Sequence, residues 1–472
     1  MKVKELRLVG MLLLIVFNFL YFQATSANIA VVGAGYVGLV TAAGLAACNN
    51  SVVCVDVDRF KIDNLCNGVM PFFEPGLQEL VKSGMEKKIL RFSTDVSIEI
   101  EAADIVFIAV GTPATVEGHA DLSALHMVFD VIAETMNHCK MNAYKLIVIK
   151  STVPLNTNGR FIQWMIEKGV QKESFDIVNC PEFLREGSAV YDFFNPDRMI
   201  VGASSNESAF KVIQLFPFIQ TKQIPLIVTD PTSAEMIKYA SNAFLAVKVS
   251  FINEIANLCD RMGADVSVVS KGLGLDHRIS PYFLNPGPGF GGSCFPKDSL
   301  EIASTARDCG LDVPTISGSL LTNQLQKQVA FQKLTALCGS DLRDKKIAIL
   351  GLAFKANTDD VRYSPSIDLI MQLQSAGARI VAYDPYAMEN MQKLFPDLIC
   401  VHTAMDALVD ANACVIMTDW AEFKRFDFEK MASVMASPII VDMRNVCDIS
   451  LCKAHGIICD IIGRSSLLNQ GV

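Results

Sequence analysis

Short apolar runs alternate along the chain with longer segments in which apolar residues recur every three or four positions. The short runs consist almost entirely of Val, Ile, Leu and Ala, as expected for parallel strands buried on both faces of a sheet, and the longer segments are the helical crossovers. This alternation starts at Asn28 and predicts a doubly wound α/β domain over residues 28–215. Its expected strands are Ile29–Val32, Val52–Asp56, Ile105–Val110, Leu146–Lys150, Ile177–Cys180 and Met199–Gly202.

The pattern changes in the middle of the chain, where residues 216–330 are expected to form a second unit. No glycine or proline occurs between Thr232 and Gly263. Apolar residues recur at helical spacing in that interval, which predicts one long helix that Gly263 ends. The residues that carry this periodicity are Met236, Ala240, Ala243, Phe244, Val247, Phe251 and Ile255.

A loop rich in glycine and proline, Asn285–Ser293, follows before helical spacing resumes near Asp298. In the third unit, residues 331–472, apolar runs again alternate with helical segments. The predicted fold class is therefore α/β, with two Rossmann-like doubly wound domains joined by a long central helix. The expected strands of the third unit are Lys346–Leu350, Ile380–Tyr383, Ala413–Met417 and Ile439–Asp442.

The first 27 residues do not belong to this pattern. Three basic residues precede the apolar run Leu8–Phe22, and small residues follow it, which is the layout of a signal peptide. The run is shorter than the roughly 20 residues that span a membrane. Three interpretations stay open: an extension that the fold does not need, such as a start codon assigned too far upstream, a membrane anchor, or an export signal.

Composition and charge limit the kinds of ligand and partner that the chain can bind. The chain has 50 acidic and 41 basic residues, a net charge of −9, and no basic run of the kind that binds nucleic acid. This balance does not exclude a local basic pocket for an anionic small molecule. The 14 cysteines contain no C-x-x-C pair, and none of the six histidines falls in a metal-spaced cluster. We therefore expect reduced thiols in a cytoplasmic protein, with neither a disulfide framework nor a metal site.

A dinucleotide-binding turn is the clearest motif. Gly33, Gly35 and Gly38 follow the first strand and open a helix, which is the spacing that lets a diphosphate approach the backbone at a helix N-terminus. Asp56 closes the second strand about 20 residues later, where a carboxylate accepts hydrogen bonds from a ribose 2′-hydroxyl and repels a 2′-phosphate. The pattern predicts NAD rather than NADP. The third unit has a comparable turn at Gly351 but lacks the other glycines, so we expect it to bind a different phosphate-bearing ligand.

Cys294 differs from the other thiols. It lies at an expected helix start, glycines precede it, and Lys297 follows it. The helix dipole and the lysine would lower the pKa of the thiol and make it a nucleophile, although a buried structural cysteine is the alternative. Lys238 and Asn242 share one face of the long helix, where Lys238 either extends to solvent or polarises an oxygen.

Acidic residues also follow one of the expected strands. Glu182 and Glu186 come directly after Ile177–Cys180, at the carboxyl end of the strand, where ligands bind in such sheets. Carboxylates placed there either activate water or belong to a solvated loop.

Taken together, the chain from Asn28 to about Gly463 resembles the UDP-glucose/GDP-mannose dehydrogenase family. Six motifs, in the same order along the chain, carry the likeness. Phe295 in the fifth motif is similar to the residue found in the branch that oxidises UDP-glucose. Oxidation of GDP-mannose or UDP-N-acetylmannosamine is the alternative. The motifs are Val32–Gly38, Ser151–Pro154, Pro181–Leu184, Lys238 with Asn242, Gly289–Asp298, and Ala353–Lys355.

The resemblance implies a four-electron oxidation of UDP-glucose to UDP-glucuronate that uses two NAD in turn. Cys294 would add to the intermediate aldehyde and form a thiohemiacetal and then a thioester, which water hydrolyses. By the same likeness Lys238 and Asn242 stabilise the oxyanion, Asp298 acts as a base, and Glu182 with Thr152 places the water.

The resemblance also assigns binding residues. The residues implied for the cofactor are Gly33, Gly35, Gly38, Asp56, Lys61, Thr112, Thr152, Glu186, Lys297 and Arg362. Those implied for the sugar nucleotide are Glu182, Phe183, Leu184, Lys238, Asn242, Arg278, Asn285, Gly289, Phe290, Gly291, Lys355 and Arg444. It further implies a homodimer or higher oligomer built on the long helix, in which Arg278 reaches the partner's site.

Two other function classes share part of this pattern. A noncatalytic NAD-binding regulator would have the glycine turn but would not need Cys294. A single-step dehydrogenase of the 6-phosphogluconate or hydroxy-acid kind would share the Rossmann start and the long helix, but it would release its product after one hydride transfer.

Overall fold

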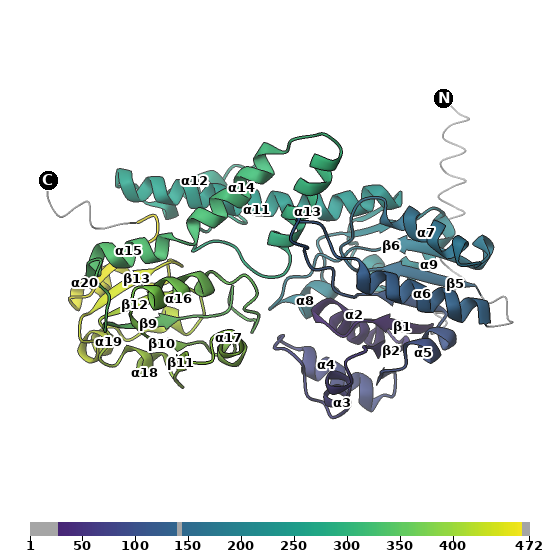
Figure 1. Cartoon of the computed structure of the whole chain (residues 1–472), viewed down its shortest axis with the longest axis horizontal. Helices are drawn as coiled ribbons and strands as arrows, with labels where there is room; N and C mark the ends of the chain where they lie inside the picture. Colours follow the sequence, from purple (N-terminus) through teal and green to yellow (C-terminus); the bar gives the residue numbers. More distant parts are fainter. Residues whose placement is uncertain (1–26, 139–143, 465–472) are drawn as a thin grey trace.

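The protein is described here from a computed structural model that covers residues 27–138 and 144–464 (Figure 1). The three interpretations of the amino-terminal segment concern residues that, apart from Ala27, lie outside this description. No helix in the described ranges combines the length and the apolar character needed to cross a membrane.

The first sheet has eight strands in the order β3-β2-β1-β4-β5-β6-β7-β8. Its first six strands follow the 3-2-1-4-5-6 order of a dinucleotide-binding fold. Neighbours are parallel except β6 and β7, which meet antiparallel at Asn179 and Gly202. All six expected strands are present, and β3 and β8 are additional. The strands are β1 (Asn28–Val32), β2 (Ser51–Val55), β3 (Leu90–Ser93), β4 (Ile105–Ile108), β5 (Lys145–Ile149), β6 (Phe175–Asn179), β7 (Met199–Gly202) and β8 (Leu226–Thr229).

Helices cover both faces of this sheet, and each face has its own apolar core. One face packs against α2 (Tyr36–Ala47), α3 (Arg59–Cys66), α4 (Leu77–Glu86), α8 (Ala189–Phe194), α9 (Asn206–Gln214) and α10 (Phe218–Thr221). The other packs against α5 (Val96–Ala102), α6 (Ser123–His138) and α7 (Thr157–Glu167). Burial on both faces explains why the strands are apolar throughout.

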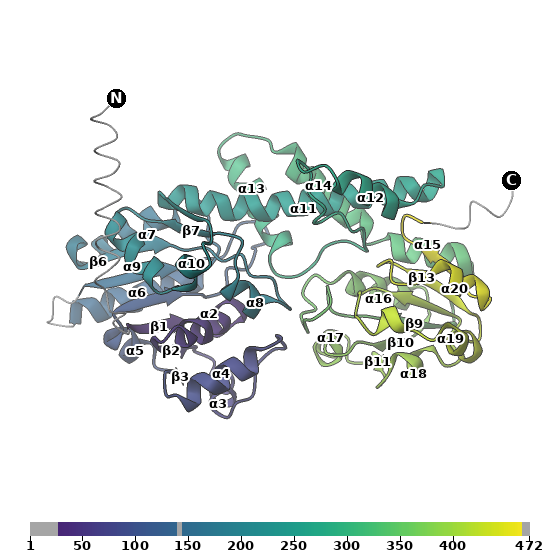
Figure 2. The ribbon, with the colours of Figure 1, turned by 180° about the vertical axis from the view of Figure 1, so that it is seen from behind.

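The long helix is α11 (Pro231–Met262), with 32 residues. Asp230 caps its start by accepting a hydrogen bond from the Ser233 N–H, and Gly263 ends it with a φ of 72°. At 1.5 Å per residue the helix is about 48 Å long. Both views show it running along the two α/β units (Figure 1 and Figure 2). The predicted helix is confirmed at both ends.

Most of the large apolar residues that predicted α11 point away from the core of the protomer. Met236, Phe244 and Phe251 are 40–64% exposed. The buried face combines small apolar residues, such as Ala243 and Ala246, with polar residues, including Lys238 and Asn242. The outer stripe is therefore an apolar surface that a single chain leaves uncovered.

The remaining helices of the central unit pack beside α11. They are α12 (Val266–Gly274), α13 (Phe295–Asp308), α14 (Pro314–Gln326) and α15 (Val329–Cys338).

The second sheet has six parallel strands in the order β11-β10-β9-β12-β13-β14, which repeats the 3-2-1-4-5-6 arrangement. The four expected strands are present; β11 and β14 are additional. Ile252, Ala256 and Cys259 of α11 belong to the core of this unit. The elements are β9 (Lys346–Leu350), α16 (Pro365–Ser375), β10 (Arg379–Tyr383), α17 (Met388–Leu394), β11 (Ile399–Cys400), α18 (Ala404–Leu408), β12 (Ala413–Ile416), α19 (Phe428–Val434), β13 (Ile439–Asp442), α20 (Ile449–Ala454) and β14 (Ile458–Ile461).

The turn between β1 and α2 depends on its glycines. Gly33 has a φ of +105°, and a Cβ atom there would lie 2.6 Å from the carbonyl oxygen of Ala109. A Cβ atom on Gly38 would lie 1.8 Å from the carbonyl oxygen of Gly33, whereas one on Gly35 would meet nothing within 4 Å. Gly33 and Gly38 are thus required for packing, and Gly35 faces open space.

Gly38→Ala is therefore expected to lower the free energy of unfolding by at least about 3 kcal/mol, because the new methyl group collides with backbone that cannot move independently. Gly35→Ala, the matched control, should cost less than about 1 kcal/mol. Denaturant-induced unfolding of both variants measures the difference. Equal stability of the two would contradict the packing described for this turn.

Candidate active site

The open space beside Gly35 lies at the N-terminus of α2, where unpaired backbone N–H groups favour an anion. Gly35 leaves room for the backbone to be approached closely. A dinucleotide diphosphate therefore fits this turn, in agreement with the roles expected for Gly33, Gly35 and Gly38.

Asp56 lies where β2 ends, beside the glycine turn. Its Oδ2 accepts hydrogen bonds from the Ala34 N–H and from Lys61 Nζ, both at 2.8 Å, and its Oδ1 accepts one from the Asp58 N–H. Partial burial raises the pKa of Asp56, but Lys61 and these backbone donors outweigh it and hold the pKa below its ordinary value. The carboxylate is thus charged and lies beside the glycine turn, with Lys61 next to it, and its role at the ribose of NAD stays a prediction.

The ends of β4 and β5 meet the start of α13. The Thr112 hydroxyl donates to the carbonyl oxygen of Thr152 at 2.8 Å. Lys297 Nζ lies 3.5 Å from Thr112 Oγ1 and 2.6 Å from Asp298 Oδ1. Thr152, Thr112 and Lys297, all expected at the cofactor, therefore form a chain of contacts that ends at Asp298, which is expected to be catalytic.

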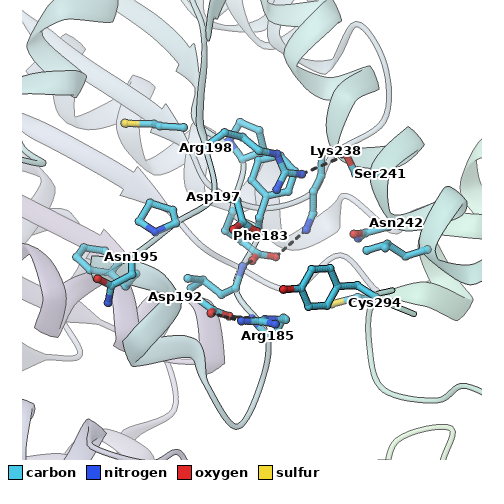
Figure 3. A pocket seen from close by; sticks show the side chains of 18 of the residues that line it. Phe183, Arg185, Asp192, Asn195, Asp197, Arg198, Lys238, Ser241, Asn242 and Cys294 are labelled. Atoms are coloured by element: carbon cyan, nitrogen blue, oxygen red, sulfur yellow. Dashed lines mark hydrogen bonds and ion pairs between the residues drawn. The ribbon is translucent and has the colours of Figure 1, made fainter. Parts of the chain in front are cut away.

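Glu182, Lys238, Asn242, Cys294 and Asp298 converge at one point. Lys238 Nζ is 3.0 Å from Glu182 Oε1, and both side chains are at most 5% exposed. Asn242 Nδ2 donates to Asp298 Oδ2 at 2.6 Å. Figure 3 shows Lys238 and Asn242 of α11 on the same side as Cys294. Lys238 is therefore not a solvent-directed lysine, and Glu182 is not in a solvated loop.

All of these residues except Asp298 line a cavity of about 800 Å³. Cys294, Lys238, Asn242, Glu182, Phe183 and Leu184 all contribute to its wall. The wall has more basic than acidic residues, although the whole chain is acidic, and this suits an anionic ligand. The basic residues are Lys150, Arg185, Arg198, Lys238, Lys248 and Arg278, and the acidic ones are Glu182, Asp192 and Asp197.

A second cavity, of about 10 Å³, shares Pro181 and Lys238 with the first. Thr152, Lys238, Glu235 and Asn179 contribute to its wall. The space matches one water molecule, with several polar groups to hold it. Thr152 and Lys238 thus share a position suited to a single water.

The expectation that the thiol of Cys294 has a lowered pKa is wrong for the free chain. Cys294 does cap the start of α13, as expected. The pKa of the thiol is raised to about 11, mainly by burial; the charges of Glu182 and Asp298 also raise it, and those of Lys238 and Lys297 lower it. Each lysine is paired with one of the two carboxylates, so neither acts on the thiol as an isolated cation.

The residues expected to bind the sugar nucleotide form two groups, one in the wall of the large cavity and one beside the second sheet. Arg278 belongs to the first group: it is exposed, ion-paired to Asp276, and lines the cavity of its own protomer, and its reach into a partner's site stays a prediction. The loop from Asn285 to Gly291 belongs to the second group and lies between α11 and the second sheet. Its fold is fixed by polar side chains: Asn253 accepts from the Gly287 N–H at 2.8 Å.

The loop reaches the second sheet at Gly287, Gly291 and Gly292. A Cβ atom on Gly287 would lie 3.1 Å from the Arg444 guanidinium, and one on Gly291 would lie 2.5 Å from the carbonyl oxygen of Tyr363. Asn323 holds Phe290 by two backbone hydrogen bonds, and its Oδ1 would lie 2.9 Å from a Cβ atom on Gly289. The loop therefore follows the surface of the second unit without room for larger residues.

Arg444 and Lys355 lie at the carboxyl ends of β13 and β9. Arg444 donates to the carbonyl oxygens of Met417 and Phe354, each at 2.8 Å, and burial lowers its pKa. Burial also lowers the pKa of Lys355, which the charges of Glu186 and Glu74 oppose. Two cations are thus held at the edge where ligands bind in a doubly wound sheet.

Glu186 and Arg362 connect the two α/β units. Arg362 pairs with Asp360 at 2.7 Å and with Glu186 at 3.3 Å, and its guanidinium lies 5.6 Å from the centre of the Tyr36 ring. The Tyr36 hydroxyl donates to Asp359 at 2.6 Å. Tyr36 is the first residue of α2, so this contact lies directly beside the glycine turn. Burial and Asp360 raise the pKa of Glu186 to about 8.

Two residues of the cavity were not singled out from the sequence. Arg198 stacks on Phe183, with 3.8 Å from the guanidinium carbon to the ring centre (Figure 3). Lys150 Nζ lies 3.7 Å from Cys180 Sγ. A signal existed for Lys150, because it ends an apolar run at the same sheet edge as Glu182; Arg198 has no comparable signal.

Alkylation of Cys294 in the free protein is expected to accelerate about tenfold per pH unit from pH 8 and to level off near pH 11, since only the thiolate reacts. Iodoacetamide labelling followed by mass spectrometry of the Cys294 peptide gives the rates. Glu182→Gln should move the profile to lower pH, because it removes a negative charge that raises the pKa. A wild-type profile that levels off near pH 7 would contradict the buried, uncharged thiol.

Comparisons with known proteins agree with this geometry. Residues 27–220 match the NAD binding domain, residues 232–325 the central domain, and residues 348–449 the UDP binding domain of the UDP-glucose/GDP-mannose dehydrogenase family. The chain is 43% identical to a UDP-glucose 6-dehydrogenase of Rhizobium meliloti (strain 1021) over 93% of this chain and 99% of the relative. It is 44% identical to UDP-glucose 6-dehydrogenase TuaD of Bacillus subtilis (strain 168) over 93% and 94% of the two chains.

Solved structures show the same likeness. A UDP-glucose dehydrogenase from Pyrobaculum islandicum is 35% identical with a TM-score of 0.83, covering 90% of this chain and 95% of its own. A UDP-D-ManNAc dehydrogenase from Pyrococcus horikoshii is 26% identical with a TM-score of 0.80, covering 92% and 99%. With its NAD-binding turn, its cysteine-centred charge cluster and three matched domains, the chain belongs to the UDP-glucose/GDP-mannose dehydrogenase family.

Proposed function

We propose that this chain oxidises the C6 hydroxyl of UDP-glucose to a carboxylate and releases UDP-glucuronate. The observation that carries the proposal is the position of the Cys294 thiol, among two buried carboxylates and two lysines, in the wall of a basic cavity. NAD, when bound at the glycine turn, supplies the acceptor for one hydride in each of two oxidations. The relatives at 40–44% identity are UDP-glucose 6-dehydrogenases, which favours UDP-glucose over GDP-mannose and UDP-N-acetylmannosamine.

In the first oxidation Lys238 and Asn242 hold the oxygen on C6. Their polar atoms lie on one face of α11, and Asn242 also binds Asp298. Asp298 is almost fully buried and accepts from both Asn242 and Lys297, so it is fixed in place as the base that takes the hydroxyl proton.

In the second oxidation the Cys294 sulfur bonds to the aldehyde carbon, and the thiol proton moves to the aldehyde oxygen. Lys238 and Asn242 stabilise the negative charge on that oxygen while the bond forms. Loss of the hydride from carbon and of the hydroxyl proton then gives a thioester. The high pKa of the free thiol fits this order, because the sulfur gives up its proton only as it reacts.

Water then breaks the C–S bond and restores the thiol. The small cavity bordered by Thr152, Lys238 and Glu235 offers a position for that water. Glu182, which pairs with Lys238 of that wall, is the carboxylate to which we assign removal of the water's proton. Glu182 and Thr152 together therefore serve the hydrolysis, and Asp298 serves the oxidations.

We also propose a division of labour between three units. Residues 28–215 hold NAD, residues 216–330 supply the catalytic helix and the dimer contact, and residues 331–472 hold the UDP portion through Lys355, Arg444 and the loop from Asn285 to Gly291. The second sheet has the strand order of a nucleotide-binding unit but lacks the glycine spacing of a dinucleotide site, which supports this assignment.

The test of the reaction is the number of NADH formed per sugar. Limiting UDP-glucose should yield two NADH per molecule, with UDP-glucuronate as the product identified by mass spectrometry. GDP-mannose and UDP-N-acetylmannosamine should react with kcat/KM at least about 100-fold lower. A yield of one NADH would show a single-step dehydrogenase instead.

Cys294→Ala is expected to reduce UDP-glucuronate formation by a factor of at least about 1,000, because the aldehyde loses its covalent partner. NAD and UDP-glucose binding, measured calorimetrically, should change little. Cys309→Ala provides the matched control, since Cys309 is an exposed thiol at the other end of α13. Near-normal turnover in the Cys294 variant would exclude covalent catalysis at this position.

We further propose that two chains associate through the outer face of α11. Phe244, Phe251 and Leu258 lie on that face, each at least 46% exposed, and a second copy is an occupant that would cover them. An interface there would also place the exposed Arg278 close to the partner.

Phe251→Glu combined with Leu258→Glu is expected to shift the protein to monomer, because two carboxylates would be buried without partners. Size-exclusion chromatography with light scattering measures the mass. Leu394→Glu, at an exposed leucine on α17, is the control and should leave the mass unchanged. A wild-type chain that is monomeric would refute the proposed dimer.

A further inference from the structure

Three cysteines meet in the second α/β unit, away from Cys294. Cys447 lies in the turn after β13, Cys452 on α20, and Cys459 on β14. Their sulfur atoms all lie within 4.8 Å of one another, and each residue is at most 7% exposed. None of the three lines the catalytic cavity.

The fold brings them together in a way that the spacing does not reveal. Four residues separate Cys447 from Cys452 and six separate Cys452 from Cys459, so no C-x-x-C pair exists. Helix α20 has only six residues, so the crossover from β13 to its parallel neighbour β14 is short and brings the three cysteines together. The expectation that the cysteines form no metal site was based on spacing alone.

The sulfur atoms, all within 4.8 Å of one another, are close enough to reach metal–thiolate geometry with small movements. With metal–sulfur bonds of about 2.3 Å and tetrahedral angles, two bound sulfurs lie about 3.8 Å apart. Donors on three separate elements, buried and already gathered, need only small adjustments to surround one ion. A disulfide would join two of them and leave the third unused.

Charge and donor type decide the class of ion. Sulfur donors favour thiophilic cations and disfavour magnesium and calcium. The fully buried Asp442 lies next to the cluster, and its Oδ2 accepts from the Cys447 N–H at 2.8 Å. Three thiolates beside this carboxylate leave less uncompensated negative charge around a divalent ion than around a monovalent one.

We propose that Cys447, Cys452 and Cys459 bind one divalent thiophilic ion of the zinc class. Three metal–sulfur bonds form, three thiol protons pass to solvent, and nothing is oxidised or reduced. The ion joins β13, α20 and β14, and it fixes the turn that also carries Arg444.

The test uses the full chain, stripped with a chelator under a thiol-free reductant and then given zinc chloride alone. After gel filtration, plasma mass spectrometry should find about one zinc per chain in the wild type. Cys452→Ser should lose it, whereas Cys309→Ser and Cys294→Ala should keep it, the first as an exposed control thiol and the second as a control for binding in the catalytic cavity. Zinc retained by Cys452→Ser, or lost from Cys294→Ala, would overturn the proposal.

A second measurement on the wild type alone remains decisive if Cys452→Ser fails to fold. Cobalt(II) chloride added to the stripped protein should produce thiolate-to-metal charge-transfer absorption with the intensity of three thiolates, and zinc should remove it stoichiometrically. Zinc should also raise the Tm by several degrees. No charge-transfer absorption, or a native disulfide between two of these cysteines, would overturn the proposal.

Discussion

The buried ion pair between Lys238 and Glu182 holds the reaction centre together. It joins the long helix to the end of β6, and both partners are almost completely excluded from water. Removing one member of such a pair costs about 3–5 kcal/mol, because the other charge stays buried without compensation. The buried carboxylate of Asp298 is likewise compensated, because it accepts hydrogen bonds from Lys297 and Asn242. Two cations and two anions therefore surround Cys294 and nearly cancel, which leaves burial as the main influence on its thiol.

Much of the fold follows from local patterns. Strands buried on both faces are continuous apolar runs, which can be recognised in the sequence, and each strand expected on that basis is present in the two sheets. The two-residue strand β11 and the mixed sequence of β3, Leu90–Ser93, carry too little of that pattern to be recognised. The ends of α11 were predictable because its cap and its terminal glycine act locally. The direction in which its faces point was not, since the buried face carries Glu235, Lys238 and Asn242 among small apolar residues, and these polar side chains find their partners far away in the chain.

In the candidate site, too, features that depend on local sequence could be predicted and features that depend on distant contacts could not. The glycine turn and Asp56 could be predicted because their chemistry depends on neighbours within one strand–turn–helix unit. The pKa of Cys294 could not, because burial and the charges on β6 and α11 control it, and no sequence pattern reports them. Lys297 appeared as a free cation in the sequence, yet the structure pairs it with the adjacent Asp298. Residues that act through long-range contacts, such as Arg198, leave no local signature.

The contact between Tyr36 and Asp359 bears on how the dinucleotide is exchanged. It closes the second α/β unit over the first residue of the helix that faces the dinucleotide, and Arg362 with Glu186 reinforces it. Two hydride transfers to one retained sugar require the spent dinucleotide to be exchanged between them. The joint borders the turn at which that exchange takes place, so its contacts are among those that the exchange would have to release.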